Sequence, residues 1–252
     1  MKIEYASITD TGLKAKENQD SILCMAKEDS AIFAVADGMG GHANGAYASR
    51  TVIEAVSAWW KEYIEQTEGT ENYFQNVEGI KRALACANDR IRESAGENVI
   101  CGSTVVVLFI RDGVYTVFSC GDSKCYRLIK KLLSSDFSIM TTDDVWENDP
   151  EMTKELTQEE IRSHRKYGKL LRAVGTEKSF FCSVASDEIK GNSVYLLCSD
   201  GLYKYISERE IIKMMKKASS GAALKECIEY LKQKVFNQGA PDNISVIMTR
   251  IR

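Results

Sequence analysis

Short apolar runs rich in β-branched and aromatic residues recur along the chain, and they constrain its fold more than any other feature of the sequence. Each run has five to eight residues, which suits a β-strand better than a helix. Asp112 and Gly113 separate two of the runs, a pair of residues typical of the turn of a β-hairpin. The clearest runs cover residues 30–36, 104–110, 114–120, 124–129, 194–198 and 244–251.

Amphipathic helices are predicted in groups between these strands. Apolar residues recur at every third or fourth position in 52–63, in 80–91 and again in 224–235. Ser207 and Glu210 form a capping-box pattern at the start of one more helix. Hairpin-linked strands with grouped helices indicate an α+β fold, in which helices cover antiparallel strands. Periodicity is compatible with one sheet or with two.

The chain is expected to form a single domain over residues 1–252. It has 252 residues, 44% of them hydrophobic, and only 2 prolines, which leaves little material for a linker. Residues 143–178 are polar and irregular, and they include a short helix that Thr157 and Glu160 would cap. We interpret 143–178 as a surface insertion or flap.

Composition excludes several classes of protein. The net charge of −3 argues against a nucleic-acid partner, and no apolar run approaches the roughly 20 residues that a membrane helix needs. The first ten residues contain no apolar signal core, so we expect a cytoplasmic protein. The 8 cysteines contain no CxxC pair, and we expect reduced, mostly buried thiols.

Five aspartates lie where strands meet turns. They are Asp20, Asp37, Asp122, Asp200 and Asp242. Taken singly, each is a common turn residue, because Asp and Gly favour turns. Taken together, they are the carboxylates that Mg²⁺ or Mn²⁺ prefers, and two such ions can activate a water for attack on phosphorus. Sequence alone does not show that the five side chains converge.

Six motifs in order make the chain resemble the bacterial branch of the protein phosphatase 2C family. They are ENQD, VADGMGGHANGAYAS, GSTVVV, CGDSKCYRL, LLCSDGLYKYIS and APDNISVIM, and they span nearly the whole chain. The resemblance implies a four-layer α-β-β-α sandwich, with two antiparallel sheets flanked by helix pairs. It also implies two to three Mn²⁺ or Mg²⁺ ions at one end, between the sheets.

By matched position, the resemblance assigns roles to individual residues. Asp37 would bridge two core metals and Gly38 would bind one through its carbonyl, while Asp200 and Asp242 complete the binuclear centre. Asp20 would lie among the metal-bound waters. The two remaining assignments are Asp122 at a third metal and Asn243 as the hydrogen-bond partner of the Asp242 carboxylate.

Three positions leave alternatives open. His42 is either a proton shuttle near the leaving group or a structural residue of the glycine turn, since other branches place a histidine where this chain has Met39. Ala15 stands where bacterial relatives carry a phosphate-binding arginine. Lys14 and Lys16 flank it and are candidate phosphate ligands, although a lysine offers a point charge and no bidentate fork. Their alternative role is that of solvated turn residues.

The resemblance therefore implies a metal-dependent protein serine/threonine phosphatase with a metal-bridged water as its nucleophile. Its partners would be phosphorylated proteins, namely the substrates of a cognate Ser/Thr kinase, and it would act as a monomer, without nucleic acid or membrane. The alternative is a pseudophosphatase that binds phosphoproteins without turnover. A nuclease or phosphodiesterase is disfavoured, because the sequence contains no basic stripe.

Overall fold

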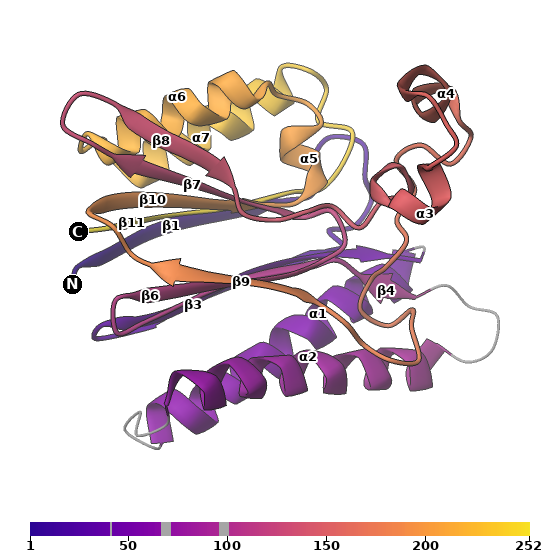
Figure 1. The fold of residues 1–252 in the computed structure, drawn as a ribbon, viewed down its shortest axis with the longest axis horizontal. Helices are drawn as coiled ribbons and strands as arrows, with labels where there is room; N and C mark the ends of the chain where they lie inside the picture. Colours follow the sequence, from indigo (N-terminus) through magenta and orange to yellow (C-terminus); the bar gives the residue numbers. More distant parts are fainter. Residues whose placement is uncertain (41, 67–71, 96–100) are drawn as a thin grey trace.

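Two antiparallel sheets face each other in the computed structural model (Figure 1). The structure describes residues 1–40, 42–66, 72–95 and 101–252, without the side chains of residues 42, 43, 65 and 66. The first sheet contains, in order, β1 (Ile3–Asp10), β11 (Ile244–Ile251), β10 (Asn192–Cys198), β7 (Lys124–Lys130) and β8 (Ser135–Ile139). The second contains β2 (Asp20–Lys27), β3 (Ser30–Met39), β5 (Val105–Arg111), β6 (Val114–Cys120) and β9 (Ser183–Glu188), with the short β4 (Gly102–Ser103) beside β3.

The central strands are apolar on both faces because both faces are covered. In β3, Ile32 and Ala34 pack toward the helices, whereas Phe33 and Val35 pack between the sheets. Tyr195 of β10 meets them from the other sheet. This alternation follows from the period of two along a strand, and it explains why the sequence shows continuous apolar runs there.

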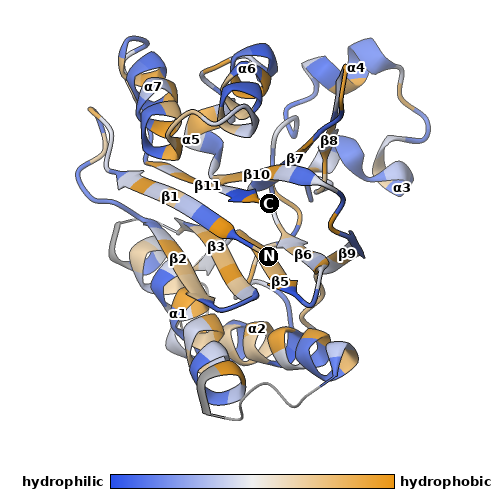
Figure 2. Ribbon diagram, turned by 90° about the vertical axis from the view of Figure 1, so that its left-hand side faces the viewer, coloured by the Kyte–Doolittle hydropathy of each residue, from blue (hydrophilic) through white to orange (hydrophobic). Residues whose placement is uncertain are grey.

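A pair of helices covers the outer face of each sheet. The helices α1 (His42–Trp60) and α2 (Tyr73–Ala95) lie on the second sheet, and α1 continues into the π-helical turn η1 (Lys61–Gln66). The helices α6 (Glu208–Ser219) and α7 (Leu224–Phe236) lie on the first sheet, with the short α5 (Asp200–Tyr203) beside them. Figure 2 shows the resulting four layers end-on. Ile80 of α2 is fully buried, and each such side chain stabilises the fold by roughly 1.5–3 kcal/mol.

The predicted four-layer sandwich is confirmed, and so are its local signals. Asp112 and Gly113 have positive φ angles of 50° and 76° and turn the chain between β5 and β6. Ser207 Oγ accepts a hydrogen bond from the Glu210 N–H at the start of α6. The strands β1, β8 and β9 and the two-residue β4 were not among the predicted ones.

Residues 143–178, which we call the flap, leave the sandwich between β8 and β9. They contain η2 (Trp146–Asn148), α3 (Pro150–Thr153) and α4 (Gln158–Ser163), and Figure 1 shows them to one side of the layers. The predicted capping box at Thr157 and Glu160 is present. His164 directly follows α4 and stacks on Trp146, with 4.1 Å between the ring centroids.

Two further observations concern the chain as a whole. The 8 cysteines are free thiols, as expected from their spacing. Within the ranges that the structure describes, no helix combines the length and the apolar character that crossing a membrane requires.

Candidate functional site

The five predicted aspartates lie at strand ends that meet at one end of the sandwich. We call Asp20, Asp37, Asp122, Asp200 and Asp242 the carboxylate cluster. Asp20 begins β2 and is the register partner of Asp37 in β3. Asp200 follows β10, Asp242 precedes β11, and Asp122 lies on the connection from β6 to β7. The second sheet thus supplies two carboxylates, the first sheet two, and a crossover between the sheets the fifth.

Asp20 joins the two sheets through a buried serine. The Ser199 hydroxyl donates to Asp20 Oδ2 at 2.7 Å, and the same Oγ accepts from the Ser245 N–H at 3.0 Å. Asp20 is only 7% exposed. The bond therefore fixes the carboxylate orientation and ties the start of β2 to β10 and β11.

Asp37 is held by its backbone, which leaves its carboxylate available. Its N–H donates to Thr104 Oγ1 at 3.2 Å, and its carbonyl accepts from the Thr104 N–H at 2.8 Å. Thr104 Oγ1 in turn lies 2.7 Å from Ser123 Oγ, next to Asp122. This chain of hydrogen bonds fixes Asp37 relative to the connection that carries Asp122.

Gly38 follows Asp37 at a point where β3 and α1 touch. A Cβ atom at Gly38 would lie 2.0 Å from the Gly45 carbonyl oxygen. Only glycine fits this approach, since real Cβ atoms do not come so near a carbonyl. Gly40, with φ of 120°, then turns the chain toward α1. Gly41 and the side chain of His42 lie outside the described residues, so the two interpretations of His42 stay open.

Asn243 anchors the loop between β1 and β2. Its Nδ2 donates to the carbonyls of Thr11 at 2.8 Å and Glu17 at 3.1 Å, and its Oδ1 accepts from the Gln19 N–H at 2.8 Å. The Asp242 carboxylate is bonded by the Asn243 backbone, whose N–H donates to Oδ1 at 2.9 Å. The Asn243 side chain was expected to bond the Asp242 carboxylate. It supports the neighbouring loop instead, because three backbone groups of that loop face it.

The candidate phosphate ligands Lys14 and Lys16 lie on that same loop. Both side chains are exposed, and Ala15 between them is half-buried. The loop is also fastened by the Leu13 N–H, which donates to the Ala240 carbonyl at 2.8 Å. These contacts hold the loop against the turn that carries Asp242.

Lys204 and Tyr203 complete the surroundings of Asp122 and Asp200. Lys204 Nζ lies 2.6 Å from Asp200 Oδ2 and 3.6 Å from Asp122 Oδ2. The Tyr203 hydroxyl donates to Asp122 Oδ2 at 3.1 Å. Neither residue was selected from the sequence, nor was Ser199. A signal for Lys204 was present, because an acid and a lysine four residues apart meet on a helix.

The electrostatics of the cluster reflect burial and mutual repulsion. Burial, followed by the charges of the other four carboxylates, raises the pKa of Asp37 well above its usual value. Burial and the charges of Asp200 and Asp242 raise the pKa of Asp20 to about 7. The pKa values of Asp122 and Asp242 are also raised, mainly by burial and then by Asp200. Burial lowers the pKa of Lys204, but the neighbouring carboxylates outweigh it and the net shift is upward.

These features fit a site for hard divalent cations. The cluster supplies oxygen ligands only, its charges destabilise one another, and a lysine ammonium already stands between two of them. Among the residues with described positions, no three acidic, cysteine or histidine side chains are arranged to hold an ion by themselves. Mg²⁺ and Mn²⁺ usually retain several waters, so a few carboxylates and the Gly38 carbonyl are the kind of donor set they need.

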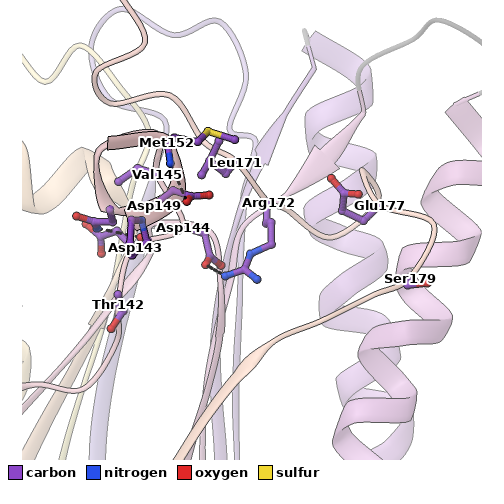
Figure 3. Close-up of a pocket in the computed structure, with 12 residues that line it drawn as sticks. Thr142, Asp143, Asp144, Val145, Asp149, Met152, Leu171, Arg172, Glu177 and Ser179 are labelled. Atoms are coloured by element: carbon purple, nitrogen blue, oxygen red, sulfur yellow. Dashed lines mark hydrogen bonds and ion pairs between the residues drawn. The ribbon is translucent and has the colours of Figure 1, made fainter. Parts of the chain in front are cut away.

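The flap meets the site beside Asp122. The Asp144 N–H donates to the Gly121 carbonyl at 2.9 Å, and the Gly121 N–H donates to Asp144 Oδ2 at 3.0 Å. Arg172 pairs with the same carboxylate, as the dashed line in Figure 3 shows. Asp143 pairs with Lys124 at 2.8 Å.

A pocket of about 550 Å³ lies in the flap, whose own residues line it together with the adjoining Thr142 and Ser179 (Figure 3). Asp143, Asp144 and Asp149 line one side of it, and Glu177 lies apart from them. The first two carboxylates are paired with cations, and Asp149 accepts from backbone N–H groups at the start of α3. No member of the carboxylate cluster lines the pocket, so it adjoins the candidate site without forming it.

The chain is similar in sequence and fold to several known proteins. A family model described as protein phosphatase 2C matches residues 14–235. The serine/threonine phosphatase stp of Listeria monocytogenes is 27% identical over 244 residues, which cover 95% of this chain and 92% of that protein. The structure of the Mycobacterium tuberculosis serine/threonine phosphatase PstP/Ppp has a TM-score of 0.79 and 25% identity, with 99% of each chain covered. A structure of the PstP catalytic domain in complex with 2 manganese ions has a TM-score of 0.76 and 23% identity, covers 99% of each chain, and supports the fold alone.

Proposed function

Because the chain belongs to the protein phosphatase 2C family, we propose that it is a metal-dependent phosphatase that hydrolyses phosphoserine and phosphothreonine in proteins. The observation that carries the proposal is the carboxylate cluster, in which burial and four neighbouring carboxylates raise the pKa of Asp37. Such a concentration of buried negative charge calls for cations. A phosphate ester, itself an anion, binds there only if cations are present.

We assign the metals to the residues that surround Asp37. Asp37, the Gly38 carbonyl, Asp200 and Asp242 would hold two Mn²⁺ or Mg²⁺ ions, and Asp20 would hydrogen-bond to their waters. Asp122 is the candidate ligand of a third. Divalent ions at this place supply Lewis acidity, which activates water and neutralises phosphoryl oxygens.

The chain's own residues orient this site. The Ser199 hydroxyl fixes the Asp20 carboxylate, and Asn243 holds the loop of Lys14 and Lys16 against the Asp242 turn. In the absence of an arginine at Ala15, we propose that one of these two lysines contacts the substrate phosphate. His42 is the candidate proton donor to the leaving oxygen, with water as the alternative.

The proposal extends to partners and setting. We infer that residues 1–252 form one catalytic domain, that the flap shapes substrate choice, and that the enzyme acts as a monomer. The substrates would be phosphoproteins made by a partner Ser/Thr kinase. The 8 free cysteines suit a reducing compartment such as the cytoplasm.

Phosphate release from a phosphothreonine peptide and from para-nitrophenyl phosphate tests the proposal. We expect turnover with Mn²⁺ or Mg²⁺, none with excess chelator, and a loss of at least about a hundredfold in Asp37→Asn. Asp112→Asn is the matched control, because Asp112 lies on the β5–β6 turn and Asn tolerates its positive φ. A folded protein that binds Mn²⁺ and the phosphopeptide but releases no phosphate would contradict the proposal and support a phosphoprotein-binding role.

A further inference from the structure

Lys204 places a positive charge inside the carboxylate cluster. Its Nζ lies 2.6 Å from Asp200 Oδ2 and 3.6 Å from Asp122 Oδ2, so one ammonium group contacts both carboxylates. The side chains of Asp200 and Asp122 are 17% and 8% exposed, whereas that of Lys204 is 47% exposed. The half-exposed Lys204 side chain thus brings its positive charge to two largely buried carboxylates.

Local structure determines this position. Lys204 directly follows α5, and it is four residues after Asp200, the spacing at which side chains meet on one helix face. Tyr203, on the same turn, donates its hydroxyl to the Asp122 oxygen that Lys204 faces. The end of this short helix therefore presents one hydrogen-bond donor, the Tyr203 hydroxyl, to Asp122 and one ammonium group to both acids.

The neighbouring lysine has a different partner. Lys124 Nζ lies 2.8 Å from Asp143 Oδ2 and 4.4 Å from the centre of the Tyr203 ring. Among the ion pairs of the described ranges, only those of Lys204 involve members of the carboxylate cluster. Lys204 is thus the internal cation of the candidate metal site.

We propose that the Lys204 ammonium takes the place of a cation between Asp122 and Asp200, so that a divalent ion binds at this pair only by displacing it. This inference rests on the proposed metal site and adds a competing group to it. An ammonium and a divalent ion require the same carboxylate oxygens, and they cannot both contact Asp122 Oδ2 and Asp200 Oδ2 at bonding distance. The other side of the cluster, around Asp37 and Asp242, has no such competitor among the ion pairs of the described chain.

The consequence is a graded set of metal affinities. Ions held by Asp37, Asp200 and Asp242 would bind first, because Asp200 retains a second oxygen for them. An ion that uses Asp122 would bind last and weakest. Its occupancy would depend on how readily the half-exposed Lys204 side chain leaves the two carboxylates for water.

Mn²⁺ binding to the metal-stripped full-length chain tests the proposal by calorimetry and by the electron paramagnetic resonance signal of free Mn²⁺. In Lys204→Met, which keeps the apolar stem and removes the charge, we expect the weakest Mn²⁺ site to tighten about tenfold, the effect of losing one charged hydrogen bond at a partly exposed site. Lys204→Arg should bind like the parent. The double variant Lys204→Met with Asp122→Asn should lose the gain, because the site needs that carboxylate.

Two controls separate this proposal from general electrostatics and from misfolding. Lys124→Met removes a neighbouring positive charge that pairs with Asp143, and it should tighten Mn²⁺ binding less than Lys204→Met does. Lys204→Gln provides a second neutral variant if Lys204→Met does not fold. Equal Mn²⁺ affinities in the parent and the neutral variants would overturn the proposal, as would a gain that persists without Asp122.

The outcome is independent of catalysis, since it is read from metal binding. If the parent chain binds Mn²⁺ and Lys204→Met binds it more tightly, the inference holds even when no phosphate is released. If turnover is metal-dependent but Lys204→Met leaves every Mn²⁺ affinity unchanged, the inference fails and the proposed function stands.

Discussion

Asp20→Asn should change how the stability of the metal-free protein depends on pH. Burial, aided by the charges of Asp200 and Asp242, raises the pKa of Asp20 from 3.8 to about 7 in the folded state. A carboxyl with a raised pKa holds its proton more tightly when folded. Its stabilising contribution is therefore complete below the unfolded pKa and is lost as the pH rises through the folded value.

The magnitude follows from the size of the shift. About three pKa units at 1.4 kcal/mol each give an upper limit of about 4 kcal/mol for Asp20 between pH 4 and pH 7. The cluster shares its protons, so part of this energy belongs to Asp37 and the other neighbours. For the two units from pH 5 to pH 7 we expect the parent to lose about 2–3 kcal/mol relative to Asp20→Asn.

Denaturant unfolding in excess chelator at pH 5, 6, 7 and 8 measures this difference. Asn stays neutral at every pH, and its Oδ1 can still accept the Ser199 hydroxyl, so packing is preserved. Asp112→Asn, an exposed aspartate outside the cluster, should follow the parent at every pH. Parallel pH profiles for Asp20→Asn and the parent would refute the reasoning, because they would show that burial of this carboxyl carries no linked proton.

Three other substitutions test the surroundings of the site. Ala15→Arg should lower the Michaelis constant for a phosphopeptide about tenfold with little change in kcat, because a guanidinium binds phosphate through two hydrogen bonds. Ala15→Met is the uncharged control. An unchanged Michaelis constant in Ala15→Arg would show that position 15 does not face the phosphate. Asn243→Ala should lower the free energy of unfolding by about 2–4 kcal/mol, since three backbone groups lose their partner. A loss below about 0.5 kcal/mol in urea denaturation would contradict the role of Asn243 as the anchor of the loop between β1 and β2. Gly45→Ala should cost about 1–3 kcal/mol and weaken Mn²⁺ binding, because the new Cβ would lie 2.8 Å from the Gly38 carbonyl oxygen. Gly113→Asn is the control for Gly45→Ala in thermal unfolding, because Gly113 has nothing within 4 Å and a positive φ that Asn accepts. Equal melting temperatures for the two variants would argue against the close approach of Gly45 to the Gly38 carbonyl.

The sequence predicted the inner elements of the fold better than its edges. The strands β3, β5, β6, β7, β10 and β11 carry continuous apolar runs because both of their faces are covered. The strands that were missed are β1, β8 and β9, which lie at sheet edges, and the two-residue β4, which pairs with β3 outside the main strand order. In β1, β8 and β9, partly buried residues are interrupted by exposed ones, as in SVASDE of β9, so no continuous apolar run marks these strands. Short edge strands are identified by the neighbour to which they bond, and that neighbour lies far away in the sequence.

The site shows the same division between local and long-range information. Each aspartate was visible at the end of a strand, but their convergence depends on the register of β2 with β3 and on the packing of the two sheets. The role of Ser199 depends on Asp20, which is 179 residues away in the chain. Lys204 could have been found locally through its spacing from Asp200. Its approach to Asp122, however, requires the folded connection between β6 and β7.

The distribution of the cluster over both sheets links cation binding to the stability of one end of the sandwich. Asp20 and Asp37 belong to one sheet and Asp200 and Asp242 flank strands of the other, so their repulsion acts to separate the sheets at that end. The buried contacts among residues such as Phe33, Tyr195 and Ile247 hold the sheets together along the rest of their length. Removal of cations should therefore loosen the end that carries the cluster without unfolding the core. While no divalent ion is bound, the Lys204 ammonium offsets part of the repulsion at Asp200, and the Ser199–Asp20 hydrogen bond ties the two sheets together.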